Sequence, residues 1–266
     1  MSDLPVCQTL RLVLQAGVLH ITLDRPDSRN AMNRQMLDEL RATLAAVCFD
    51  HSVRLLVLRG TGGHFCAGGD LQDMARARGA GVDACRELNR AFGALLEETQ
   101  NAAQVVIAVL QGAVLGGGLG LACVSDIAIA RSNADFGMPE TSLGLLPAQI
   151  APFVARRIGL TQARRLALTA ARFDGNEAGR LGLVHFVEAD EQALDARLET
   201  VIAQVLRCAP EANAATKALL LDEQPLAPLL DRAAEWFAQA VSGEEGSEGT
   251  LAFVQKRVPR WAPSSS

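Results

Sequence analysis

Two glycine-rich segments carry the residue pattern best suited to chemistry. They read GHFCAGGDL at 63–71 and GAVLGGGLG at 112–120. Glycine lets a backbone approach a ligand closely, and the free N–H groups at the start of a helix favour negative charge. If the two segments face one another, each can aim one N–H at the same oxygen. That arrangement is an oxyanion hole made from backbone alone.

Each segment alone also fits tight helix packing through small residues. A dinucleotide site and a phosphate-binding loop are disfavoured, because Gly116, Gly117 and Gly118 lack the G-x-G-x-x-G spacing and no Lys-Ser/Thr pair follows either segment. The uncharged run 99–125 is long enough to cross a bilayer, where about 20 residues suffice. Four polar amides interrupt it, however, so we expect a buried strand-to-helix unit and no membrane partner.

The elements that would position these segments alternate between strands and helices. Alternating apolar residues at 9–26 predict a β-hairpin turning at Ala16-Gly17, and strands are expected within 53–70, 104–111 and 126–137. Helical spacing is found at 33–50 and 82–102, and a short helix is expected within the glycine run. This order indicates an α/β fold with right-handed crossovers. After about residue 190 only helical patterns remain, so we divide the chain into a core, 1–190, and a helical oligomerisation region, 191–266.

Bulk properties exclude several classes of function. The 266 residues are 49% hydrophobic and 21% charged, with a net charge of −5 and no basic block, which disfavours a nucleic-acid partner. The six cysteines are scattered and the four histidines show no metal-ligand spacing. This cysteine usage and the absence of a signal-peptide pattern predict a cytoplasmic protein without a bound metal or redox cofactor.

Taken together, five segments resemble the crotonase, or enoyl-CoA hydratase/isomerase, superfamily in order and spacing. They are LDRPDSRNAMN (23–33), GHFCAGGDLQDM (63–74), GAVLGGGLGLACVSDIAIA (112–130), ADFGMPETSLGLLP (134–147) and GTLAFVQKR (249–257). The resemblance implies a spiral core of ββα turns, a C-terminal helical trimerisation region, and a trimer or a dimer of trimers. It also implies an acyl-CoA substrate and no further cofactor.

The resemblance also assigns roles to residues of this chain. Ala67 and Gly117 would donate the oxyanion-hole N–H groups to the thioester carbonyl, and Glu140 would transfer the proton. The CoA channel and the adenine and phosphate end would be contacted by Arg29, Ala31, Ala67, Gly68, Gly69, Asp70, Leu71, Gly117, Phe253 and Lys256.

Hydratases of this family usually carry a second glutamate, and here that position is Gly120. A glycine there would leave room for a branched or dicarboxylic acyl chain. The segments 145–159 and 161–175 resemble hydratases of branched, carboxylated 2-enoyl-CoAs, such as the isohexenylglutaconyl-CoA of acyclic terpene degradation. We therefore expect hydration of such a thioester. The alternatives are a Δ3-Δ2 enoyl-CoA isomerase that uses one glutamate and a non-catalytic acyl-CoA-binding homologue.

Four polar residues near these segments have less direct interpretations. His64 is expected to pack the first glycine loop, and Asp70, although placed in the CoA channel by the resemblance, also fits the cap of the following helix. Arg156 and Arg157 could meet a substrate carboxylate, but on a helix such residues usually face solvent.

Overall fold

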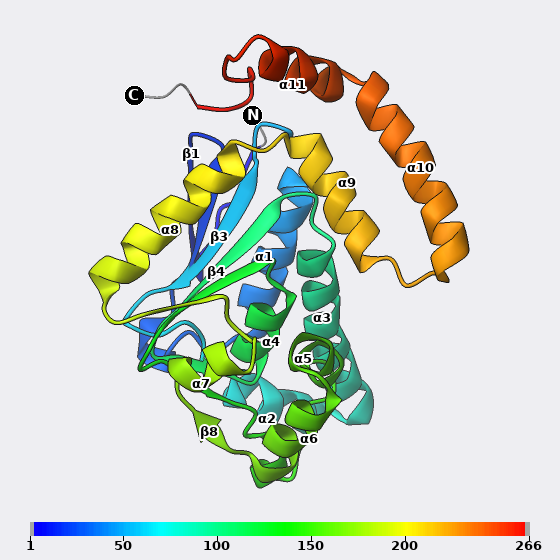
Figure 1. Cartoon of the computed structure of the whole chain (residues 1–266). Helices are drawn as coiled ribbons and strands as arrows, with labels where there is room; N and C mark the ends of the chain where they lie inside the picture. Colours follow the sequence, from blue (N-terminus) through cyan, green and yellow to red (C-terminus); the bar gives the residue numbers. More distant parts are fainter. Residues whose placement is uncertain (1–2, 264–266) are drawn as a thin grey trace.

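The computed structural model describes residues 3–263 and contains two β-sheets flanked by helices (Figure 1). The larger sheet has the strand order β1-β2-β3-β4-β6-β9, and the smaller one has the order β5-β7-β8. The strand bounds are β1 Leu10–Gln15, β2 Val18–Leu23, β3 Leu55–Gly60, β4 Val105–Leu110, β5 Ala113–Leu115, β6 Ile127–Arg131, β7 Asp135–Gly137, β8 Arg172–Phe173 and β9 Phe186–Glu188.

The chain begins with the hairpin that the sequence predicts. Strands β1 and β2 pair antiparallel, with Gln15 opposite Val18. The two residues between them, Ala16 and Gly17, have φ values of 49° and 81°. Positive φ at both positions is characteristic of a tight two-residue turn whose twist matches that of the strands. All later pairings within the larger sheet are parallel.

The following turns of the chain repeat a ββα pattern, which confirms the predicted α/β fold. In one turn β4 is followed by β5 and helix α4 (Gly117–Val124), and in the next β6 is followed by β7. The first strand of each pair joins the larger sheet and the second joins the smaller sheet. The first glycine segment therefore follows β3, and the second contains β5 and enters α4.

Both faces of the larger sheet are covered. Along β3, Leu56 and Leu58 pack in the cluster that includes α1 (Arg34–Val47) and α3 (Val82–Gln100). The alternate residues Leu55 and Val57 pack in a second cluster with α8 (Glu191–Leu206). A strand buried on both faces has a continuous run of apolar residues, as LLVLRG here shows.

Shorter helices surround the end of the sheet that holds the glycine segments. They are α2 (Leu71–Ala80), α5 (Ala151–Ile158), α6 (Leu160–Thr169), α7 (Gly175–Arg180) and the 3-10 helices η1 (Pro26–Ser28) and η2 (Glu140–Leu143). Figure 1 shows α2, α5 and α6 in the lower part of the molecule, on the side away from both termini. No helix among residues 3–263 is long and apolar enough to span a membrane.

The last three helices, α9 (Pro210–Leu221), α10 (Leu226–Ser242) and α11 (Glu244–Val254), extend away from the core (Figure 1). Neither α9 nor α10 contains a buried residue. The strands end at Glu188, near the predicted boundary at residue 190, but α8 beyond that boundary packs on the sheet. The division at 190 therefore stays a prediction, and α8 packs with the core.

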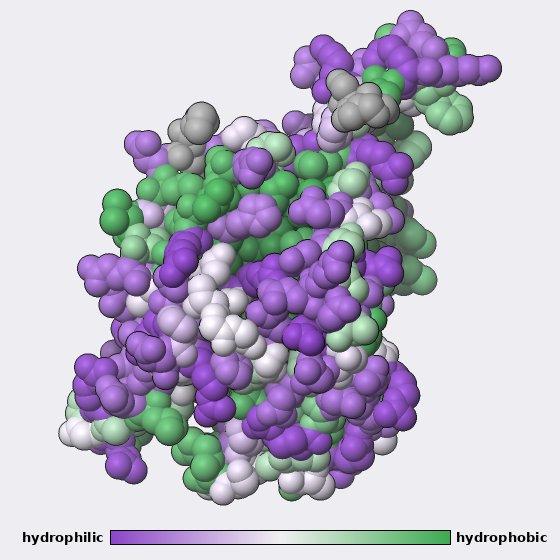
Figure 2. Space-filling view, turned by 90° about the vertical axis from the view of Figure 1, so that its left-hand side faces the viewer, coloured by the Kyte–Doolittle hydropathy of each residue, from purple (hydrophilic) through white to green (hydrophobic). Residues whose placement is uncertain are grey.

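The segment after α11 returns to the sheet and is held by Arg54, which precedes β3. The guanidinium of Arg54 donates hydrogen bonds to the carbonyls of Leu206, Cys208 and Trp261. Figure 2 looks onto the left-hand side of Figure 1 and shows apolar surface gathered in the upper half of that face, below the C-terminal helices. The lower half is mostly hydrophilic.

Candidate active site

The first glycine loop is paired along its length with the segment that enters α1. The Ala67 N–H donates to the Arg29 carbonyl at 3.0 Å, the Met32 N–H to the Gly68 carbonyl at 2.8 Å, and the Asp70 N–H to the Met32 carbonyl at 3.0 Å. The segment 29–32 therefore lies beside the loop 67–70, and the role of both in lining a CoA channel stays a prediction.

This pairing corrects the predicted oxyanion donor. The Ala67 N–H is occupied by the Arg29 carbonyl, so it has no proton to offer a substrate. In the parallel bridge between Met32 and Gly69, the hydrogen bonds of Met32 go to the Gly68 carbonyl and come from the Asp70 N–H. The Gly69 N–H therefore points away from the Met32 segment. Within residues 3–263 the Gly69 N–H has no acceptor. The free donor of this loop is two residues after the predicted one.

The second glycine loop turns directly from β5 into α4. Gly116 has a φ of 48° and a ψ of −112°, a conformation that side chains rarely tolerate, and its N–H donates to the Gly137 carbonyl at 3.0 Å. Gly117 is the first residue of the helix, and its N–H has no acceptor within the described chain. This N–H is free to donate, and the role of Gly117 as an oxyanion donor stays a prediction.

The two loops and Glu140 meet at one point. A Cβ placed on Gly116 would lie 3.7 Å from the Gly68 Cα and 2.8 Å from Glu140 Oε1, and one on Gly68 would lie 3.3 Å from the Leu115 carbonyl oxygen. Gly68 has a φ of 100°, which again favours glycine. The loops are thus close enough only because these positions have no side chain.

The Glu140 carboxyl is removed from water without being neutralised by a cation. Its Oε2 atom is buried and has no hydrogen-bond partner within residues 3–263. Burial raises the pKa of the Glu140 carboxyl above its usual range, because desolvation disfavours the charged form. An unpartnered buried oxygen is rare in proteins and indicates a functional role here. A proton acceptor of raised pKa therefore lies beside the two free N–H groups.

The structure contradicts the predicted open space at Gly120. A Cβ on Gly120 would lie 2.6 Å from Ile150 Cγ2 and 3.2 Å from Leu96 Cδ1. Both side chains are buried, Leu96 in α3 and Ile150 just before α5. Apolar groups occupy the position where a second glutamate would project, so the glycine leaves no room for an acyl branch.

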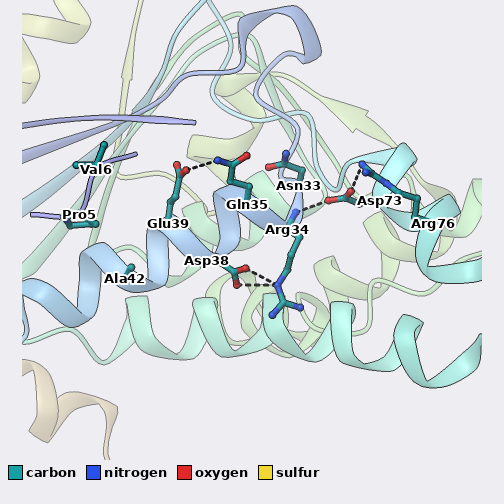
Figure 3. Close-up of a pocket in the computed structure, with 10 residues that line it drawn as sticks. All are labelled: Pro5, Val6, Asn33, Arg34, Gln35, Asp38, Glu39, Ala42, Asp73 and Arg76. Carbon is teal, nitrogen blue, oxygen red and sulfur yellow. Dashed lines mark hydrogen bonds and ion pairs between the residues drawn. The ribbon is translucent and has the colours of Figure 1, made fainter. Parts of the chain in front are cut away.

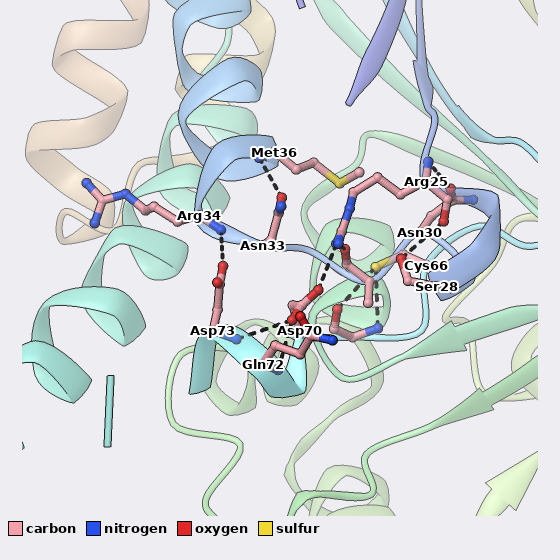
Figure 4. A network of polar contacts seen from close by, with 12 residues as sticks. Arg25, Ser28, Asn30, Asn33, Arg34, Met36, Cys66, Asp70, Gln72 and Asp73 are labelled. Atoms are coloured by element: carbon pink, nitrogen blue, oxygen red, sulfur yellow. Dashed lines mark hydrogen bonds and ion pairs between the residues drawn. The ribbon is translucent and has the colours of Figure 1, made fainter. Parts of the chain in front are cut away.

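Asp70 supports the first loop and is not free to contact a ligand. Its carboxylate accepts from the N–H groups of Gln72 and Asp73 at the start of α2, and Arg25 Nη1 donates to it at 2.9 Å (Figure 4). Asp70 is 8% exposed. The cap interpretation is therefore confirmed, and the assignment to the CoA channel is wrong for this side chain. Leu71, by contrast, is exposed beside the loop.

Further side chains fix the first loop. The Asn30 amide donates to the carbonyls of Thr61 and His64 at 2.9 and 2.8 Å, and its oxygen accepts from the Arg25 N–H. His64 Nδ1 accepts from the Ala113 N–H at 3.0 Å, which joins the two glycine segments. The expected loop-packing role of His64 is confirmed. The loop is rigid enough to hold an N–H in place.

The two arginines of α5 differ in their surroundings. Arg156 is exposed, as expected of a solvent-facing residue, and pairs with the exposed Glu223 at 2.6 Å. Arg157 donates to the carbonyls of Leu183 and Ser125, and burial lowers the pKa of its guanidinium. Arg157 therefore joins α5 to the core, and Arg156 joins it to the segment after α9.

Phe253 and Lys256 lie far from the glycine loops of their own chain. They belong to α11 and the turn after it, at the top of Figure 1, whereas α2 lies in the lower part. Phe253 is 85% exposed. A role in CoA binding therefore requires a second subunit, and it stays a prediction.

A shallow depression of about 640 Å³ lies at the start of α1, lined by Asn33 and Arg34 and, from α2, by Asp73 and Arg76 (Figure 3). Its charged groups are already paired: Asp73 accepts from the Arg34 N–H and from Arg76. Neither glycine loop lines it. We regard it as a feature of the surface next to the site.

Sequence reasoning missed the apolar wall of the site. Met32 and Phe92 lie against Gly117, and Met74 lies against Gly69. These residues come from α2, α3 and the segment before α1, and their meeting depends on tertiary packing. One local signal was present, namely Gly93, a glycine inside an otherwise good helix.

Comparison with known proteins agrees with this geometry. The family model described as enoyl-CoA hydratase/isomerase matches residues 14–264. The chain is 33% identical over 248 residues to the 2,3-dehydroadipyl-CoA hydratase of Escherichia coli K12, and the match covers 92% of this chain and 95% of that protein.

Solved structures are more similar still. Pseudomonas aeruginosa AtuE is 69% identical, with a TM-score of 0.95, and the match covers 96% of this chain and all of that chain. An enoyl-CoA hydratase/isomerase from Marinobacter aquaeolei is 54% identical, with a TM-score of 0.94, and the match covers 97% of this chain and all of that chain.

Proposed function

Because the chain belongs to the enoyl-CoA hydratase/isomerase family, we propose that it hydrates a 2-enoyl-CoA, with Gly69 and Gly117 as oxyanion donors and Glu140 as the proton carrier. The observation that carries the proposal is the buried, unpartnered Oε2 of Glu140 beside the glycine loops. Addition to the double bond places negative charge on the thioester oxygen. Fixed backbone donors stabilise that charge, and one donor is typically worth about 3 kcal/mol.

A single carboxylate can perform both proton transfers in turn. Glu140 takes a proton from water while the water oxygen bonds to the β-carbon, and the electrons of the double bond move onto the thioester as an enolate. The enolate then takes that proton from Glu140 at the α-carbon, and the carbonyl re-forms. Burial favours the first step, because the raised pKa of Glu140 makes its carboxylate a stronger base toward water.

For the acyl group we propose a branched, carboxylated chain of the isohexenylglutaconyl type. The support is the resemblance of segments 145–159 and 161–175, together with the dicarboxylic acyl chain in the name of the E. coli relative. The space at Gly120 gives no support, because Ile150 and Leu96 fill it.

We also propose that the working form is a trimer or a dimer of trimers in the cytoplasm. The six cysteines are unpaired, as expected of a reducing compartment. The C-terminal helices expose large apolar side chains, and such surface marks contact sites. They are Leu220, Leu221, Leu226, Leu230, Phe237, Val241, Leu251, Phe253 and Val254. In this arrangement Phe253 and Lys256 would reach the CoA of a neighbouring subunit.

Isomerisation is the second candidate, and the absence of an acid at position 120 favours it. The deciding experiment incubates the protein with straight, branched and carboxylated enoyl-CoAs and measures product masses. Hydration adds one water, whereas Δ3-Δ2 isomerisation moves the double bond without a change in mass. Binding of every thioester with no turnover would instead indicate a non-catalytic acyl-CoA-binding protein.

A further inference from the structure

One face of α3 forms a wall beside the N-terminus of α4. Asn89 lies three and four residues before Phe92 and Gly93, and Leu96 lies four and three residues after them, which places all four on the same side of a helix. Phe92 lies against Gly117 and Leu96 against Gly120. Leu96 is fully buried, and Asn89 is exposed at the other end of the stripe. The stripe therefore runs from the core to the surface past the proposed oxyanion donor.

Gly93 in the middle of this stripe accommodates a polar side chain. A glycine inside a helix costs about 1 kcal/mol relative to alanine. A Cβ at Gly93 would coincide with Gln149 Oε1. The amide of Gln149 in turn donates to Asn89 Oδ1 at 3.0 Å. The glycine thus admits a glutamine that bridges α3 to the segment between Glu140 and α5.

The guanidinium of Arg90 also lies close to Gly93. Arg90 Nη1 lies 3.1 Å from the Cβ position of Gly93, next to the Gln149 amide. Within residues 3–263 Arg90 forms a single ion pair, with Glu97 at 3.0 Å, and both side chains are 59% exposed. Exposed pairs of this kind contribute at most about 1 kcal/mol, so a ligand can readily replace Glu97. Arg25, in contrast, is held by the nearly buried Asp70.

We propose that Arg90, with the amides of Asn89 and Gln149, forms a subsite for the carboxylate at the far end of the acyl group. This inference rests on the proposed function and adds the residues that select a dicarboxylic thioester. A guanidinium and an amide N–H offer convergent donors to a carboxylate, and charge-assisted bonds of this type are the stronger ones. Phe92, the neighbour of Gly93 in α3, lies against Gly117, so the thioester and the carboxylate would contact the same helix.

The test measures binding of two unreactive thioesters of equal chain length, glutaryl-CoA and pentanoyl-CoA, by calorimetry. Arg90→Gln should weaken glutaryl-CoA about tenfold, the lower end for a charge-assisted bond, and change pentanoyl-CoA less than twofold. Arg86→Gln is the matched control. It removes the same charge one turn earlier on α3, where Arg86 pairs with Asp83, and it should change neither affinity.

Equal weakening of both ligands by Arg90→Gln, or no weakening of glutaryl-CoA, would overturn the subsite. Gly93→Ala is a second variant that improves helix propensity while displacing Gln149, and it should also weaken glutaryl-CoA selectively. Because both ligands are saturated, the outcome does not depend on turnover. If the wild type hydrates no enoyl-CoA but the selective loss is seen, the proposed reaction fails and the subsite stands.

Discussion

Positions 140 and 120 are the two places where hydratases of this family usually carry glutamates, and in this chain the two positions differ in side chain and surroundings. At 140 a carboxyl is buried with one oxygen unpartnered. At 120 there is no side chain, and Ile150 and Leu96 fill the volume where one would project. One position keeps an acid that desolvation makes more basic, and the other has become part of the apolar core.

The absence of a glutamate side chain at position 120 therefore leaves no empty space that a ligand group could occupy. Two carboxylates close together disfavour simultaneous ionisation and titrate as a pair. With apolar neighbours at 120, Glu140 titrates without such a partner, and its pKa is raised by desolvation alone. Substitutions at Glu140, at Gly120 and at the neighbours of Gly120 test this difference between the two positions.

The largest effect is expected from Glu140→Gln. The amide keeps the size of the side chain but cannot accept the proton, so kcat should fall about 10²- to 10⁴-fold. Steady-state hydration of the best thioester in the panel measures this. Turnover near that of the wild type would place the proton transfer on another group.

Stability provides the control for that variant. A raised pKa means that the folded protein binds this proton more tightly than the unfolded chain does. The resulting contribution to stability is present at low pH and is lost as the pH rises through the raised pKa. The neutral amide of glutamine does not carry the desolvation cost of a buried charge. At pH 7 Glu140→Gln should therefore unfold at the same denaturant concentration as the wild type or at a higher one.

Gly120→Glu should be the next most damaging change, although it restores the usual pair of acids. Its Cβ meets Ile150 and Leu96, and its charge enters an apolar site, so we expect a loss of several kcal/mol in the free energy of unfolding. Urea denaturation measures the loss, and kcat/KM should fall for both crotonyl-CoA and glutaconyl-CoA. A stable variant that is faster on crotonyl-CoA would show that the second site is open.

A smaller effect is expected for Gly120→Ala, at about 1–3 kcal/mol of destabilisation from overpacking. Ile150→Ala removes the Cγ2 atom that the new Cβ would meet, so the double variant should be more stable than the sum of the single changes predicts, by at least about 0.5 kcal/mol. Ile158→Ala, in α5 but not among the three atoms nearest to the Cβ position of Gly120, should combine with Gly120→Ala additively. Additive behaviour with Ile150 as well would contradict the packing described here.

The subtlest expectation is a displaced pH profile. Hydration needs ionised Glu140, so kcat/KM should fall as the pH is lowered through the pKa of the free enzyme. Because burial raises that pKa, the acidic limb should lie above the usual glutamate range. If kcat/KM instead falls with a midpoint at about pH 4.3, the ordinary pKa of a glutamate, then the Glu140 carboxyl is well solvated.

Much of the fold follows from local patterns in the sequence. The hairpin at Ala16-Gly17, a helix within 33–50 and a buried strand within 53–70 are found where alternation, helical spacing and an apolar run predict them. The glycine loops fall at strand-to-helix junctions as expected. These features depend on neighbours along the chain, so sequence alone suffices for them.

The errors concern contacts between distant segments. The Ala67 N–H is occupied because it meets the Arg29 carbonyl, and the Gly69 N–H is free because the bridge to Met32 uses the groups of Gly68 and Asp70. No local pattern reveals either contact, since Met32 lies 37 positions before Gly69. The volume beside Gly120 depends on Ile150 and Leu96, which the sequence does not place. A missing side chain suggests space, but in a close-packed interior neighbours fill it.

Arg54 joins two segments that are synthesised at very different times. Its guanidinium, beside the third strand, is half-buried and needs the carbonyl of Trp261, 207 residues later. A ribosome makes Arg54 207 residues before Trp261, so the nascent core carries a guanidinium that still lacks this acceptor. Contacts this distant in sequence close late in folding. The segment around Trp261 therefore completes a part of the molecule that was made 207 residues earlier.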